Sequence, residues 1–160
     1  KARERKKSVP PARVYSAQGQ RWSPPRQSFG QCAADQIYVS EVHPKGKPAD
    51  YIELRNASPT ACDLGGFSLT DDLKQEGLVF GITILPSGGC WLGYEEGKGS
   101  FSFGISAEAE TIYLKNSSGE VRSWEVMAED VKSSVSFDFA GNSTFSTPSP
   151  GRVDPEDSVD

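Results

Sequence analysis

Short β-rich runs separated by turn residues dominate the sequence after residue 35. No stretch of ten or more positions has apolar residues at the 3.6-residue spacing of a core-covering helix. Eight or nine runs at a spacing of roughly 8–12 residues, divided by Gly, Pro and Asn, predict an all-β fold, an antiparallel β-sandwich. The expected strands are Gln36–Val42, Asp50–Arg55, Gly66–Leu69, Leu78–Ile84, Cys90–Tyr94, Phe101–Phe103, Thr111–Lys115, Glu120–Trp124 and Val135–Phe139.

Charge divides the chain in two. Residues 1–30 hold eight basic side chains and one acidic side chain, a net charge of +7, whereas the other 130 residues hold nine basic and 21 acidic side chains, a net charge of −12. Pro10-Pro11 and Pro24-Pro25 exclude a continuous helix from the basic part, which also has few large apolar residues. We therefore expect an extended basic arm (1–35), a β-sandwich domain (36–153) and an acidic tail (154–160).

Six sequence blocks form a recognisable series: VSEVHPKG (39–46), DYIELRNAS (50–58), DLGGFSLTDD (63–72), LPSGGCWL (85–92), ETIYLKNSSGEV (110–121) and FSTPSPG (145–151). Together these blocks resemble the lamin tail domain family over about Gln36 to Val153. That resemblance implies an immunoglobulin-like β-sandwich with a role in binding or scaffolding. The chain departs from nuclear lamins because no coiled-coil heptads precede the domain, and the closing TPSPG is more typical of the non-lamin members.

The blocks have physical roles that the structure can check. Ile52 and Leu54 alternate with polar residues, so we expect them in the core. Asn56 suits the turn after that strand, because its side chain can bond nearby backbone. Gly65-Gly66 permits a sharp reversal that returns Leu64, Phe67 and Leu69 to the core. Asn116–Gly119 gives the strongest hairpin signal in the chain, and Pro148 and Pro150 should end strand pairing.

Catalytic and metal-binding patterns are weak in this sequence. His43, the one histidine, stands in a turn before Pro44, where we expect it to be exposed. Glu41 and Glu53 lie on strands that could be neighbours, but we interpret them as solvent-facing residues paired with Lys or Arg rather than as an acid–base pair. Asp63, Asp71 and Asp72 do not have the spacing of a calcium loop. We predict no catalytic residues, no metal site, no cofactor and no enzymatic activity.

Three cysteines leave two alternatives open. A disulfide between Cys62 and Cys90 would leave Cys32 as a free thiol. Three reduced, buried thiols are the alternative that we favour, so the redox compartment stays undecided. The start at Lys1 rather than Met favours a processed organellar or exported protein over a cytosolic or nuclear one. No apolar run approaches the ~18–20 residues of a membrane span.

The basic arm has several interpretations. It can run over an acidic surface of a protein partner, stiffened by its Pro pairs and anchored by Trp22. It can also bind nucleic acid by neutralising phosphates and stacking bases, or be a solvated tail. We favour the first, a structural or adaptor subunit whose sandwich docks in a larger protein assembly while the arm extends over neighbouring subunits. The expected partner-binding residues are Arg13, Tyr15, Arg21, Trp22, Arg26 and Phe29.

Overall fold

The structure, a computed structural model of the 160-residue chain, describes residues 9–44, 49–106, 108–127 and 133–151. Three predicted features lie partly or wholly outside the described residues. They are residues 1–8 of the arm, residues 45–46 of the turn after His43, and the acidic tail (154–160). The elements are β1 (Arg13–Tyr15), the 3₁₀ turn η1 (Ala34–Gln36), β2 (Ile37–His43), β3 (Tyr51–Asn56), β4 (Cys62–Asp63), β5 (Ser68–Thr70), β6 (Leu78–Val79), β7 (Ile84–Leu85), β8 (Cys90–Tyr94), β9 (Glu110–Lys115), β10 (Val121–Val126), β11 (Ser134–Phe137) and β12 (Ser143–Ser146).

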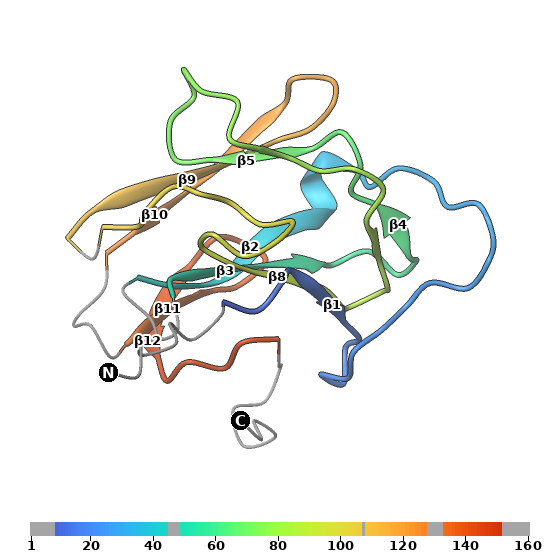
Figure 1. Ribbon diagram of the computed structural model, residues 1–160, viewed down its shortest axis with the longest axis horizontal. Helices are drawn as coiled ribbons and strands as arrows, with labels where there is room; N and C mark the ends of the chain where they lie inside the picture. The colour runs from blue at the N-terminus through green and yellow to red at the C-terminus, as the bar shows by residue number, and fades with distance from the viewer. Residues whose placement is uncertain (1–8, 45–48, 107, 128–132, 152–160) are drawn as a thin grey trace, which may run out of the picture.

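Two antiparallel sheets pack face to face, which confirms the all-β sandwich. The larger sheet has the order β1-β8-β3-β2-β11-β12 and the smaller one the order β10-β9-β5-β6, with β4 and β7 as a separate pair. In Figure 1 the smaller sheet is the upper layer and the larger sheet the lower layer. Among the described residues, no helix has the length and apolar character to cross a membrane.

The core lies between the two sheets and follows the alternation of the strands. Ile52 and Leu54 of β3 are fully buried, as predicted. Leu64, Phe67 and Leu69 also belong to the core cluster. Trp91 of β8 packs edge-on against Phe80 with ring centroids 5.0 Å apart. Because successive side chains of a strand point to opposite faces, the alternating apolar residues of β3 share the face that lies in this core.

The predicted turns form with the expected chemistry. The Asn56 side-chain amide donates to the carbonyl oxygens of Thr60 (3.0 Å) and Leu85 (3.1 Å), and its oxygen accepts the Ser58 N–H. Gly66 has φ +87°, a conformation that glycine adopts without a Cβ penalty. Asn116–Gly119 joins β9 to β10, whose six residue pairs run from Val121↔Lys115 to Val126↔Glu110. The Asn116–Gly119 turn thus joins two neighbouring strands of the smaller sheet.

Two predicted strands are wrong. Leu78–Ile84 is not one strand, because β6 pairs with β5 while β7 pairs with β4. The chain changes sheets between them, where the Asp63 carboxylate accepts the Thr83 N–H at 2.9 Å. Phe101–Phe103 forms no strand. Its alternation reflects local packing instead, since Phe101 is buried and the two rings lie 4.7 Å apart.

Candidate protein-interaction site

The N-terminal segment of the described chain is part of the domain rather than an arm outside it. β1 pairs antiparallel with β8, with Val14 opposite Trp91. Val14 packs against the core cluster, and the Ala12 N–H donates to the Lys98 carbonyl oxygen at 2.9 Å. Residues 13–15 therefore form an edge strand of the larger sheet, which differs from the predicted extended arm over residues 1–35.

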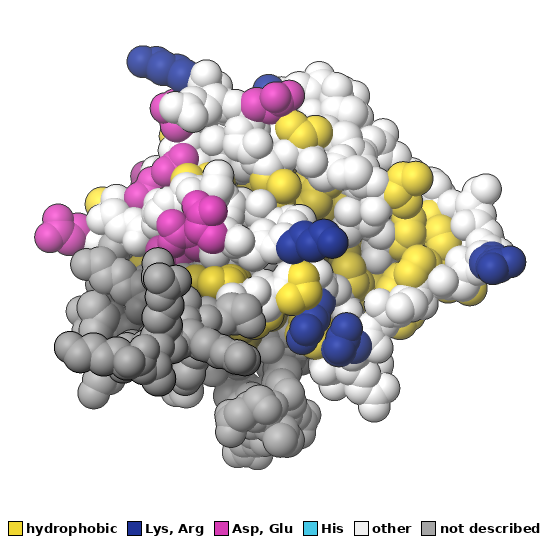
Figure 2. Space-filling view, viewed as in Figure 1, with side chains coloured by type: hydrophobic (Ala, Val, Ile, Leu, Met, Phe, Trp, Pro, Cys, Tyr) yellow, Lys and Arg dark blue, Asp and Glu magenta, His cyan; other side chains and the backbone are white. Residues whose placement is uncertain are grey.

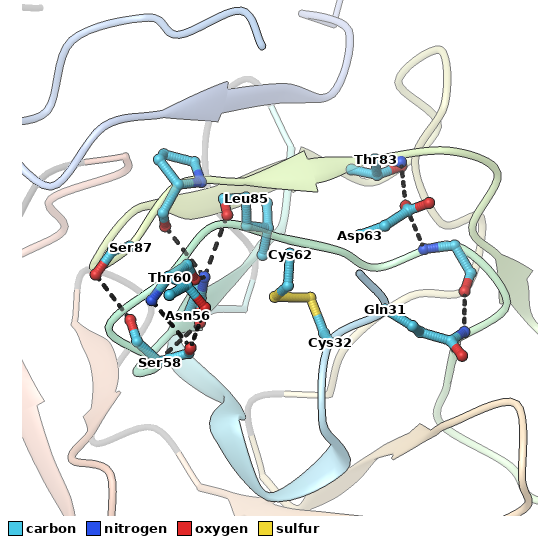
Figure 3. The surroundings of a disulfide bond; sticks show 12 residues. Gln31, Cys32, Asn56, Ser58, Thr60, Cys62, Asp63, Thr83, Leu85 and Ser87 are labelled. Atoms are coloured by element: carbon cyan, nitrogen blue, oxygen red, sulfur yellow. Dashed lines mark hydrogen bonds between the residues drawn. A yellow bond between two sulfur atoms is a disulfide. The ribbon is translucent and has the colours of Figure 1, made fainter. Parts of the chain in front are cut away.

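The far end of the segment is fixed by a disulfide. Cys32 is bonded to Cys62 across 30 residues of sequence (Figure 3). The alternative of a Cys62–Cys90 bond is wrong, and so is that of three reduced thiols. Cys62 belongs to the core cluster, whereas Cys90 lies opposite Arg55 on β3 and is a free, buried thiol. Burial raises the pKa of Cys90 well above its ordinary value, which keeps this thiol protonated.

Backbone and side-chain bonds reinforce this attachment. The Cys32 N–H donates to the Asp63 carbonyl oxygen, and the Asp63 N–H donates to the Gly30 carbonyl oxygen, both at 2.8 Å. The Gln31 side-chain amide donates to the Gly65 carbonyl oxygen at 2.7 Å (Figure 3). Residues 16–29 thus form a loop whose two ends, β1 and Gly30–Cys32, are both anchored to the sandwich.

Three of the predicted partner-binding residues meet at one hollow. Arg13, Arg21 and Trp22 line a hollow of about 510 Å³ together with Ala12, Val14 and Ser23. The Trp22 N–H donates to the Val14 carbonyl oxygen at 3.0 Å, which places this part of the loop beside β1. Trp22 is partly buried and Arg21 is exposed. An aromatic ring and two guanidinium groups therefore share one surface depression.

The remaining predicted residues lie elsewhere on the same segment. Phe29 lines a second hollow of about 370 Å³, which also includes Pro24, Pro25 and Ile82. Arg26 is exposed on the loop, whereas Tyr15 in β1 contacts Gly151 near the C-terminus. Ile82 was missed by the sequence reasoning because it fell inside the predicted strand Leu78–Ile84.

Positive charge on this segment has no described acidic neighbour. Residues 9–30 contain three arginines and no Asp or Glu. Within the described residues, the salt bridge formed is that of Arg55 with Glu53. Figure 2 shows dark-blue basic side chains near the centre of the visible face, beside yellow apolar ones, while magenta acidic side chains gather mainly on its left. Among the described residues, the segment therefore presents positive charge without a salt-bridge partner, next to apolar surface.

Glu41 and Glu53 are neighbours, as expected, but they are not exposed. The two residues are paired in the β2–β3 register, and each is only 2% exposed. The prediction of solvent-facing glutamates is wrong because the C-terminal segment crosses this outer face of the larger sheet. In Figure 1 that segment passes below the lower layer after β12.

Both carboxylates hold this C-terminal segment, residues 147–151. Glu41 accepts the Ser149 N–H (3.1 Å) and the Ser149 hydroxyl (2.9 Å), as well as the Tyr51 hydroxyl. Glu53 accepts the Gly151 N–H at 2.9 Å and bonds to Arg55 at 2.8 Å. Burial raises the pKa of Glu53, and the Arg55 charge opposes that rise. The network is a structural attachment whose carboxylate oxygens already have donors.

His43 belongs to the same buried cluster, so the prediction of an exposed histidine is wrong. Its Nδ1 lies 2.9 Å from the Ser134 hydroxyl, and its ring stacks on Tyr51 at 5.4 Å. Burial lowers the pKa of His43, although Glu41 and Asp50 oppose that shift. Ser134 is completely buried. Among the described residues, no group of three His, Cys, Asp or Glu side chains could hold a metal ion.

Comparison with known proteins identifies the domain. A family model for the Lamin Tail Domain matches residues 31–128, more than half of the chain. The chain belongs to the lamin tail domain family. The family fold is an immunoglobulin-like domain without enzymatic activity, and membership indicates a protein-interaction module. No curated protein and no solved structure gives a significant match. β1 and the loop 16–29 precede the lamin tail domain match, whereas Cys32 and Cys62 lie inside it.

Proposed function

We propose that this lamin tail domain protein is a non-enzymatic adaptor subunit of a larger protein assembly. Its docking face consists of Arg13, Arg21, Trp22, Arg26 and Phe29, on β1 and the loop 16–29. The observation that carries the proposal is the attachment of this segment at both ends, by the β1–β8 pairing and by the Cys32–Cys62 disulfide. A segment anchored in this way displays its side chains without the ordering cost that a free arm incurs on binding.

The composition of the docking face suits protein recognition. Trp and Arg are enriched among the residues that contribute most to protein–protein affinity. Arg21 and Arg26 are exposed and have no described acidic partner, so they are available to carboxylates of another protein. The basic face would also attract an acidic partner over distance and raise the association rate. The assembly, in this proposal, binds the side of the sandwich where β1 forms the edge.

Co-purification with a matched control tests this function. The variant R21A/W22A/R26A removes two charges and one anchor from the docking face. The control variant K74A/L73A/K115A removes two charges and one apolar side chain from exposed positions outside it. Mass spectrometry should find a stoichiometric protein partner with the full chain and with the control, but not with the docking-face variant. Equal recovery with all three proteins would contradict the proposal.

Nucleic-acid binding is the competing outcome, since Arg side chains and a partly exposed Trp ring can also contact phosphates and bases. Fluorescence titration of the full chain with single-stranded DNA measures this directly. Under the adaptor proposal, nuclease treatment does not reduce partner recovery. A DNA affinity that falls steeply with salt and is lost in R21A/W22A/R26A would instead favour the nucleic-acid alternative.

A further inference from the structure

Ile82 exposes most of its apolar side chain. It is 88% exposed, whereas its neighbour Ile84 is 8% exposed. Single exposed apolar residues are ordinary on protein surfaces, but a contiguous apolar patch marks an interaction site. Ile82 belongs to such a patch, because it lines the 370 Å³ hollow with Ile84, Phe29, Pro24 and Pro25.

The walls of this hollow are fixed by the fold. Gly30–Cys32 is bonded to β4 by backbone hydrogen bonds and by the disulfide at Cys62. On the opposite side, the Thr83 N–H donates to the Asp63 carboxylate, and the Leu64 N–H donates to the Thr83 carbonyl oxygen at 2.8 Å. Phe29 and Ile82 therefore stand next to rigid anchors on both sides of the hollow. A preformed apolar depression loses little entropy when it binds a side chain.

Charge around the hollow favours an acidic ligand. Of the described residues that line it, Asp63 alone is charged. The Asp63 Oδ1 accepts the N–H groups of Gly65 (2.8 Å) and Thr83 (2.9 Å), and these two donors partly offset its negative charge. Arg26 is exposed between two lining residues, Pro25 and Gln27, and Arg21 is exposed at the start of the same loop. Figure 2 shows an apolar patch on the right of the visible face, with a basic side chain at its edge.

We infer that the hollow between Phe29 and Ile82 accepts one large aliphatic side chain from an acidic segment of the partner protein. The acidic residues beside that side chain pair with Arg26 and Arg21. This inference rests on the proposed function and specifies its partner. Binding of the aliphatic group buries Ile82 and Phe29, and this burial contributes most of the affinity. The carboxylates orient the segment and raise its association rate in a salt-dependent way.

A peptide titration of the full chain, monitored by NMR of isotope-labelled isoleucine methyl groups, tests the inference. The probe is a synthetic octapeptide with four acidic residues and one leucine. One matched peptide has alanine in place of the leucine, and another has Asn and Gln in place of the acids. We expect the Ile82 and Ile84 methyl signals to shift saturably with the probe. Removal of the leucine, or I82S in the protein, should weaken binding about tenfold.

The controls separate this inference from the proposed function. L73S removes an apolar side chain that is 52% exposed outside the hollow, and it should leave the titration unchanged. The peptide without acids should bind more weakly, and added salt should remove that difference. Unmoved Ile82 and Ile84 signals up to about 5 mM probe, or equal affinities with I82S, would overturn the inference. The proposed function fails independently, if R21A/W22A/R26A still recovers the partner.

Discussion

At the scale of single residues, Glu41 and Glu53 are the most consequential side chains of the outer sheet face. Each is buried on neighbouring strands and accepts donors from the C-terminal segment, through Ser149 and Gly151 respectively. A buried carboxylate is tolerated only when such donors compensate for its lost hydration. Glu41 and Glu53 thus accept hydrogen bonds from the backbone of the chain's own C-terminal segment.

Replacement of Glu41 should be costly. E41A leaves the Ser149 N–H and hydroxyl and the Tyr51 hydroxyl without their acceptor. We expect the free energy of unfolding in urea to fall by about 2–3 kcal/mol. The exposed control E76A should change it by less than about 0.5 kcal/mol. An equally small effect of E41A would show that the glutamate does not hold the C-terminal segment.

His43 should make stability depend on pH. Burial holds its folded-state pKa below the ordinary 6.5, so the unfolded chain takes up the proton first as the pH falls. The free energy of unfolding should therefore decrease from about pH 7.5 to pH 5.5 relative to that of H43N. The raised pKa of Glu53 acts in the opposite direction, but its contribution cancels in this comparison. Identical pH profiles for both proteins would contradict the burial of a neutral His43.

At the scale of elements, the disulfide and the C-terminal segment attach the two ends of the described chain to the sandwich. Cys32 connects the loop 16–29 to β4, which carries Cys62. Residues 147–151 leave β12 and cross the outer face of the larger sheet to reach β1, where Gly151 meets Tyr15. The disulfide lies inside the family match, whereas the attachment through residues 147–151 lies outside it.

Loss of the disulfide should destabilise the domain. C32S/C62S opens a loop of 30 residues, for which the chain-entropy model predicts a loss of about 3–4 kcal/mol in the free energy of unfolding. Urea denaturation with and without reductant measures this loss. Reductant should lower the free energy of unfolding of the original protein and leave that of C32S/C62S unchanged. If C32S alone had no effect while C90S abolished the response to reductant, the pairing would be wrong.

Gly151 should be more sensitive to substitution than another glycine with the same backbone conformation. Gly151 has φ +74°, and a Cβ there would lie 2.8 Å from the Tyr15 ring. Gly141 has φ +93° and open space around it. Both alanine variants incur the left-handed backbone cost of roughly 1–2 kcal/mol, but only G151A adds a clash. Thermal unfolding should show the lower midpoint for G151A, and equal midpoints would mean that the contact with Tyr15 is not tight.

At the scale of the whole molecule, the sequence predicted the sandwich and its core better than it predicted the attachments. The alternation of Ile52 and Leu54 and the hairpin at Asn116–Gly119 are local signals, so one sequence was sufficient to recognise them. β1 has three residues between prolines and a turn, and pairing with β8 stabilises it. No local pattern marks such a strand.

The buried polar cluster and the disulfide were missed for the same reason. Glu41 and Glu53 follow the polar alternation of solvent-facing residues, and only the later crossing of residues 147–151 covers them. Cysteine spacing does not determine connectivity, which depends on how the strands are placed in space. The residues of the proposed docking face were chosen from the sequence, whereas the two hollows that several of them line, and the place of Ile82 in one hollow, required the fold.

Residues 9–30 are attached to the domain and form a preformed face rather than a free arm. Amide hydrogen exchange of the isolated chain, measured by NMR, tests this attachment. The N–H groups of Ala12, Ser16 and Trp22 donate to the carbonyl oxygens of Lys98, Gln20 and Val14. We predict that these three amides exchange at least about tenfold more slowly than in an unfolded chain. Exchange at the unfolded rate in the absence of a partner would show that residues 9–30 are a free arm.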